Sequence, residues 1–121
     1  MSELISGPAR ATRRLSADLR RQFERIVGAD HLIVQETELA LYSYDAALDR
    51  AVPCAVVLPE NAGQISAVVK LCVKEKIPYV ARGAGTNLCG GTIPLNGAVV
   101  IAPTRMKKIL SIDPVSRTAV V

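Results

Sequence analysis

The sequence contains no tryptophan, a single phenylalanine and three cysteines, and only 3% of its 121 residues are aromatic. With so few large rings, the core must be built from valine, isoleucine, leucine and alanine, the usual filling of a sheet covered by helices. The cysteines, Cys54, Cys72 and Cys89, form no C-x-x-C pair, and His31 is the only histidine. The sequence therefore supports neither a disulfide framework nor a zinc site, and we expect His31 to be structural.

The chain also lacks a strong excess of one charge and any long hydrophobic run. Its formal net charge is +4, and six of the fifteen basic residues fall within residues 1–25, so no basic groove runs through the body. Without such a groove and without aromatic stacking platforms, nucleic acid is not an expected partner. No stretch approaches the roughly 18 apolar residues of a membrane span, and none follows Met1 as a signal peptide would require. We therefore expect a cytoplasmic chain without a membrane span.

The composition favours a folded domain. Half of its residues are hydrophobic, and its length suffices for one compact domain but not for two. After a loose start over 1–12, apolar spacing predicts an amphipathic, arginine-faced helix over 15–27 that ends at Gly28. A weaker helical pattern covers 36–47, and residues 45–50 are predicted to form a surface loop.

Three apolar runs, residues 55–58, 79–81 and 98–102, predict the strands of one sheet. A helix between the first two begins after Asn61, whose side chain we expect to cap it, with Gln64 completing a pair of the capping-box kind. Two buried strands joined by a helix run parallel with a right-handed crossover. The sequence therefore predicts an α+β domain that contains a βαβ unit, a small parallel sheet and flanking helices. Residues 109–112 and 118–121 predict a C-terminal β-hairpin.

The densest chemical signal is a glycine-rich run directly after the second predicted strand, Arg82-Gly-Ala-Gly-Thr-Asn-Leu-Cys-Gly-Gly91. It holds four of the chain's eight glycines. Glycine permits positive φ and lets the backbone approach a ligand, so successive amides can converge on an anion such as a pyrophosphate. Arg82 adds a fixed charge, and Thr86 and Asn87 add side-chain hydrogen bonds suited to phosphate or ribose oxygens. The alternative is a glycine-rich turn without a ligand.

Two common phosphate-binding templates do not fit this run. A dinucleotide-binding G-x-G-x-x-G would need glycine at position 88, where Leu88 stands, and no helical pattern follows. The spacing Gly85-x-x-x-x-Gly90-Gly91-Thr92 resembles a P-loop, but Gly91 replaces the lysine that neutralises the β- and γ-phosphates. Neither a Rossmann site nor hydrolysis of a nucleoside triphosphate is therefore predicted.

Three segments, Pro59 to Val69, Ile77 to Gly91 and Val99 to Asp113, together resemble the FAD-binding domain of the vanillyl-alcohol oxidase family, of the PCMH type. Within that family the likeness is to the FAD-linked subunit of bacterial glycolate oxidase and to related D-lactate dehydrogenases. The UDP-N-acetylmuramate reductase branch also uses a glycine loop on a similar FAD domain. Arg82 at the start of the run and Gly90-Gly91 at its end favour the glycolate oxidase branch.

The resemblance implies roles for particular residues. In such proteins the strand end corresponding to Pro59 lies near the adenosine half of FAD. The relatives that attach flavin covalently often carry histidine in the glycine loop, so Thr86 and Asn87 here imply non-covalent FAD. Cys89 is expected to be a packing residue rather than a flavin linkage, and neither catalytic residues nor metal ligands are identified. The residues implied to wrap the FAD pyrophosphate are Arg82, Gly83, Ala84, Gly85, Thr86, Asn87, Leu88, Gly90 and Gly91.

The resemblance also implies a division of the chain and a function. Residues 1–38 would form an N-terminal segment with the amphipathic helix, and residues 39–121 an FAD-binding domain truncated at its C-terminal end. The implied reaction is oxidation of a small 2-hydroxy acid, such as glycolate or D-lactate, to the 2-oxo acid. An iron–sulfur electron-transfer subunit is the implied partner, and partners could place the protein peripherally at the inner membrane. The alternative is a catalytically silent truncated domain that serves as a structural or interaction module.

Overall fold

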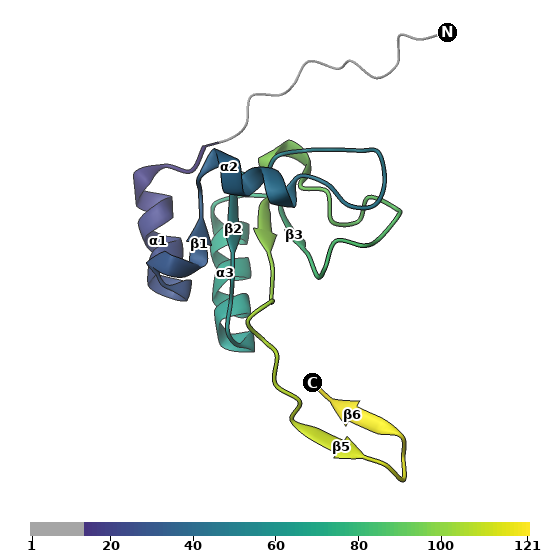
Figure 1. Ribbon diagram of the computed structural model, residues 1–121. Coiled ribbons are helices and arrows are strands. Elements are labelled where there is room, and N and C mark those ends of the chain that lie inside the picture. Colours follow the sequence, from purple (N-terminus) through teal and green to yellow (C-terminus); the bar gives the residue numbers. More distant parts are fainter. Residues whose placement is uncertain (1–13) are drawn as a thin grey trace, which may run out of the picture.

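The computed structural model describes residues 14–121, which form a mixed β-sheet flanked by helices and a separate β-hairpin (Figure 1). The loose start predicted over 1–12 lies outside the described residues. The helices are α1 (Ala17–Val27), α2 (Glu36–Leu39) and α3 (Ala62–Lys74), with 3-10 turns η1 (Ala29–His31), η2 (Ala40–Tyr42) and η3 (Leu95–Gly97). The strands are β1 (Leu32–Ile33), β2 (Ala55–Val57), β3 (Tyr79–Ala81), β4 (Val99–Ile101), β5 (Ser111–Asp113) and β6 (Thr118–Val120).

The four-stranded sheet has the strand order β1-β2-β4-β3. Strands β2 and β3 each run parallel to β4, which confirms the predicted parallel arrangement, while β1 runs antiparallel to β2 and makes the sheet mixed. In the central register Val100 of β4 lies between Val56 of β2 and Val80 of β3. The two strands joined by α3 are therefore separated by a strand that comes later in the sequence.

Helices α1 and α3 pack against each other and contribute to the larger buried cluster of the sheet. That cluster joins Phe23 of α1 to Val68 of α3 and Val57 of β2. In a second cluster Leu39 of α2 packs with Val100 of β4. Successive strand residues point to opposite faces, so β4 is buried on both faces, and this explains why its residues are all apolar and do not alternate.

Both long helices begin with a side-chain cap, and the one at Asn61 confirms the sequence prediction. The Ser16 hydroxyl accepts a hydrogen bond from the Leu19 amide at 3.2 Å, and the Asn61 side chain accepts one from the Gln64 amide at 2.9 Å. The Gln64 side chain in turn accepts from the Glu60 amide at 2.7 Å, one residue before the usual capping-box partner. These bonds satisfy amides that have no partner within the helix, so each cap fixes where its helix starts.

The helix predicted over 36–47 is wrong beyond Tyr42. Helix α2 ends at Leu39 and η2 continues only to Tyr42. The Ser43 hydroxyl then donates to the Ala40 carbonyl at 2.7 Å, and the Asp45 carboxylate accepts from the Ala47 amide at 2.7 Å. Such local side-chain bonds give the backbone an alternative to the helical ladder, and they end the helix here.

The burial predicted for the second strand is also wrong. Tyr79 is 44% exposed and Ala81 is exposed as well, whereas the three residues of β2 are buried. Because β4 occupies the centre of the sheet, β3 is an edge strand that pairs with β4 alone. The apolar run identified a strand but did not give its place in the sheet.

The predicted C-terminal hairpin is present as β5 and β6, joined in antiparallel register. Its turn is held by Asp113, whose carboxylate accepts from the amides of Val115 and Ser116 and from the Ser116 hydroxyl. These hydrogen bonds, the one from the Ser116 hydroxyl first, lower the pKa of Asp113. All six strand residues are exposed, so the hairpin stands apart from the sheet's core (Figure 1).

Burial raises the pKa of the Cys72 thiol from 9.0 to about 11, and the neighbouring Cys54 adds to the rise. An unfolded chain would release this proton first, so stability is full below pH 9.0 and is lost as the pH rises through 11. Between pH 8.5 and 11, we expect the free energy of unfolding to fall by about 2 to 3 kcal/mol more in the parent chain than in Cys72→Ala. Urea denaturation across this pH range measures the difference, and parallel pH profiles for the two chains would contradict it.

Candidate functional site

The glycine-rich run follows the carboxyl end of β3, at the edge of the sheet where β2 and β4 also end. Parallel strands bring their carboxyl ends to one edge, and in open α/β sheets ligands bind beyond that edge. Pro59 follows β2 two strands away from Arg82, which corresponds to roughly 10 Å at the usual strand spacing. The structure therefore places the two predicted cofactor-binding segments on the same edge, with the end of β4 between them.

Two of the four loop glycines have a backbone conformation that favours glycine. Gly85 and Gly90 both have a φ of +71°. A Cβ atom on Gly85 would overlap the guanidinium of Arg82, whereas one on Gly83 would meet nothing within 4 Å. Glycine is thus required by sterics at position 85, by backbone conformation at 85 and 90, and by neither at 83.

The backbone amides of the loop lack backbone partners over a long stretch. From Gly83 to Thr92, no backbone N–H donates to a backbone carbonyl anywhere within residues 14–121. Gly83, Ala84, Thr86 and Leu88 are exposed, so this stretch of the loop lies at the surface. Amides that are accessible and unpaired, in a loop bent by positive-φ glycines, can converge on an anion.

Arg82, at the start of the loop, is buried beneath it. It is only 7% exposed, and its guanidinium donates to the Tyr44 carbonyl at 2.6 Å and more weakly to the Thr92 hydroxyl at 3.4 Å. The guanidinium also lies over the Tyr42 ring, 5.8 Å from its centroid. Its positive charge therefore sits beneath Gly85 rather than on the exposed surface of the loop.

Asn87 ties the middle of the loop to the segment after η2. Its side chain donates to the Asp45 carboxylate at 2.8 Å and accepts from the Thr92 hydroxyl at 3.0 Å, and its carbonyl accepts from the Ala46 amide at 3.1 Å. Thr86 and Cys89 are exposed and make none of these contacts. Of the loop side chains expected to hydrogen-bond a ligand, Asn87 is therefore engaged within the protein and Thr86 faces solvent.

Sequence reasoning missed Tyr44, Asp45 and Thr92 as parts of this site. The sequence predicts that Asp45 lies in a surface loop, yet it is 6% exposed. An aspartate followed by two alanines carries no local signal of burial, and its partner Asn87 is 42 residues away in the sequence. The nearest available signal was the excess of amide donors in the glycine run, since a buried carboxylate needs donors.

The second predicted cofactor segment is the strand end at Pro59. Pro59 itself is buried, and Arg105 donates to the neighbouring Leu58 carbonyl at 3.1 Å and pairs with Glu60 at 3.2 Å. A cleft of about 300 Å³ lies beside this strand end. It is lined by Glu60, Asn61, Ala62, Arg105, Met106, Lys108, Leu110 and Val121.

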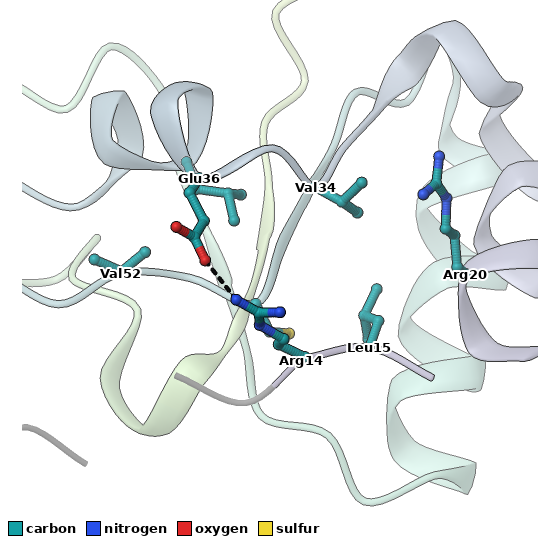
Figure 2. Close-up of a pocket in the computed structure, with 8 residues that line it drawn as sticks. Arg14, Leu15, Arg20, Val34, Glu36 and Val52 are labelled. Carbon is teal, nitrogen blue, oxygen red and sulfur yellow. Dashed lines mark hydrogen bonds and ion pairs between the residues drawn. The ribbon is translucent and has the colours of Figure 1, made fainter. Parts of the chain in front are cut away.

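A cavity of about 500 Å³ lies away from the loop, next to the start of α1 (Figure 2). Its apolar side chains include Leu15, Val34 and Val52. Its two arginines are already in ion pairs, Arg14 with Glu36 at 2.7 Å, as Figure 2 shows, and Arg20 with Glu24 at 2.8 Å. Because both charges are neutralised, this cavity is a poorer place for a diphosphate than the loop.

The described residues place two limits on other chemistry. Among residues 14–121, no group of three or more histidine, cysteine, aspartate or glutamate side chains could hold a metal ion. In the same part of the chain, no helix is long and apolar enough to cross a membrane.

Comparisons with known proteins agree on a family. A family described as "FAD binding domain" matches residues 53–121. Glycolate oxidase subunit GlcD of Bacillus subtilis is 36% identical over 108 residues, which cover 88% of this chain and 23% of that protein. D-lactate dehydrogenase of Anaerostipes hadrus is 40% identical over 76 residues, covering 63% of this chain and 15% of that protein.

A solved structure gives the same result in three dimensions. The structure of p-cresol methylhydroxylase with substrate bound matches with a TM-score of 0.70 and 29% identity, over 80% of this chain and 20% of that one. The chain spans less than a quarter of the length of each of these proteins. The matched region contains the glycine loop, α3 and the central strands, so the chain belongs to the FAD-binding domain family that is found in FAD-linked oxidoreductases of the PCMH type.

Proposed function

We propose that the glycine loop of this chain binds the pyrophosphate of FAD without a covalent bond. The observation that carries the proposal is the run of amides from Gly83 to Thr92, unpaired with any backbone carbonyl of the described residues and bent by two positive-φ glycines. Such a backbone supplies several donors to one anion at no cost in internal hydrogen bonds. The buried guanidinium of Arg82 adds favourable charge from beneath the loop.

The other contacts follow from the place of the loop in the fold. The strand end at Pro59 and its cleft lie on the same edge of the sheet and would receive the adenosine half. Thr86 is exposed and free to donate to a phosphate oxygen. A Cβ on Gly83 would meet nothing within 4 Å, so glycine there leaves the backbone open to a ligand, whereas Gly85 and Gly90 bend the loop through their positive φ. Cys89 is exposed, but we assign it no bond to the flavin.

The finer proposal concerns the reaction of a longer protein. Relatives named glycolate oxidase subunit and D-lactate dehydrogenase favour oxidation of a small 2-hydroxy acid to the 2-oxo acid. FAD, when bound, supplies the acceptor for the hydride. The word "subunit" in the name of the first relative favours a partner protein, and we propose that it is an iron–sulfur electron-transfer subunit. Within that reaction, we assign the glycine loop of this chain to binding and orienting the cofactor.

Fluorescence titration of the 121-residue chain tests the cofactor assignment. Because the proposed contacts are to the pyrophosphate and the adenosine half, FAD and ADP should both bind, whereas FMN, which lacks both parts, should bind at least about tenfold more weakly. Quenching of flavin fluorescence measures FAD binding, and competition by ADP locates the contacts. Equal affinity for FMN and FAD would contradict the loop assignment.

The second candidate is a catalytically silent structural or interaction module. The exposed apolar side chains of the hairpin region, Ile109, Leu110 and Ile112, favour this candidate, since they are between 64% and 68% exposed. The same titration separates the two functions. If neither FAD nor ADP binds at high micromolar concentration, the chain alone is a module without cofactor.

A further inference from the structure

We propose that Asp45 is a positioning residue that holds the glycine loop in its anion-binding conformation. The proposal rests on the function proposed above, because it concerns the same loop and the same ligand. Asp45 lies in the segment after η2, which runs beside the glycine loop in Figure 1. It is 6% exposed although its charge would favour water.

First, both oxygens of the Asp45 carboxylate accept hydrogen bonds within the protein. One oxygen accepts from the Ala47 amide at 2.7 Å, and the other accepts from the Asn87 side chain at 2.8 Å. A buried carboxylate is tolerated only when donors satisfy it, and here one donor comes from its own segment and one from the loop. The carboxylate therefore forms a bridge between two parts of the chain.

The second step is that the segment around Asp45 contacts the loop at its start and its middle. Tyr44 accepts from Arg82, and the Ala46 amide donates to the Asn87 carbonyl. Thr92, at the end of the loop, reaches the same network through Asn87. Residues 44–46 thus fix the loop at Arg82 and at Asn87. The loop's own amides, from position 83 to 92, make no bond to a backbone carbonyl of the described residues.

The third step concerns what these contacts do for binding. A loop without internal backbone bonds would otherwise sample many conformations, and ordering it would reduce affinity. The bond from Asn87 to Asp45 orders the loop before the ligand binds. Because this bond uses the Asn87 side chain, the backbone amides of the loop remain available to the ligand. Asp45 needs no contact with the ligand for this role.

The test compares two isosteric substitutions that remove the same charge. In Asp45→Asn the new side-chain NH2 group must face either the Ala47 amide or the Asn87 NH2 group, and both of these are donors. The control, Asp49→Asn, removes an exposed carboxylate from the same segment. Both raise the net charge by one, so a general electrostatic effect on phosphate binding affects them equally. We expect Asp45→Asn to weaken ADP and FAD binding by about 10- to 100-fold and Asp49→Asn to leave it within about twofold.

A second measurement needs no ligand. With ¹⁵N-glycine labelling, the amide signals of Gly83, Gly85, Gly90 and Gly91 report the loop directly. In Asp45→Asn we expect these signals to shift or broaden while those of Gly28 and Gly63 stay in place. The double variant Asp45→Asn/Asn87→Asp exchanges donor and acceptor, and Thr92 can still donate to the new carboxylate, so the glycine signals should return toward the parent spectrum. A purely global loss of stability would not be restored in this way.

The outcomes separate this proposal from the function on which it rests. If the parent binds and Asp45→Asn binds equally well, the positioning role is overturned and the cofactor assignment stands. If the parent binds neither nucleotide, the cofactor assignment is overturned, and the glycine spectra alone decide whether Asp45 orders the loop. Should Asp45→Asn not fold, Thr92→Val probes the network from its half-buried end, and an unchanged affinity and unchanged glycine signals there would overturn the proposal.

Discussion

Gly85→Val is expected to abolish FAD binding, with a loss of affinity of at least about 100-fold. The φ of +71° at this position is strained for any residue with a Cβ and most of all for a β-branched one. The new side chain would also overlap the guanidinium of Arg82, which is buried and bonded to Tyr44 and so cannot easily move. The loop must then change its path, and its amides can no longer converge on the pyrophosphate as proposed.

The control for this variant is Gly28→Val, which carries the same type of backbone strain elsewhere. Gly28 has a φ of +92° at the end of α1, and a Cβ there would make only an ordinary contact with His31. Both variants should lower the free energy of unfolding, by about 1 to 3 kcal/mol for the backbone strain. Only Gly85→Val should lose affinity when fluorescence titrations are corrected for the folded fraction. An equal loss in both variants would mean that stability, rather than the shape of the loop, controls binding.

Phe23→Ala is expected to cost about 3 to 5 kcal/mol of folding free energy. Phe23 is the only phenylalanine of the chain and is 0% exposed, in the cluster that joins α1, α3 and β2. Since small domains are stable by only about 5 to 15 kcal/mol, this loss would leave a substantial unfolded population. Urea denaturation monitored by far-UV circular dichroism measures it.

Val73→Ala in α3 is the matched surface control, because Val73 is 63% exposed and alanine favours a helix. Its effect should stay within about 0.5 kcal/mol. The pair also tests the predicted boundary between residues 1–38 and 39–121. If Phe23→Ala costs less than about 1 kcal/mol, the N-terminal helix folds independently of the domain; a cost in the expected range means that the helix is part of its core.

Much of the fold could be predicted because its signals are local. Helix α3 follows from Asn61 and Gln64, whose side chains and backbones interact within four residues. Helix α1 ends at Gly28 because only that residue easily takes the positive φ found there. The three apolar runs gave β2, β3 and β4 to within about a residue. Features of this kind depend on neighbours in the sequence, so one sequence suffices to find them.

The place of β4 between β2 and β3 has no local signal. The exposure of Tyr79 follows from it, since a strand's burial depends on which strands lie beside it. The helix predicted through Ala47 failed for a related reason. Ser43 and Asp45 are weak helix breakers by sequence. Their local hydrogen bonds end the helix, and the additional bond from Asn87, distant in the sequence, supports the conformation at Asp45.

By itself, the sequence determined that this chain carries a glycine-rich loop directly after a strand, because glycine content and the succession of elements along the chain can be read residue by residue. It also carried the resemblance that the FAD-binding domain family confirms. Only the tertiary structure decided that Arg82 lies beneath the loop and that Asp45 and Asn87 meet. The reason is physical: a buried charge is satisfied by donors that the folded chain brings within 3 Å, and for Asp45 one donor, the Ala47 amide, is local whereas the other, Asn87, lies 42 residues away.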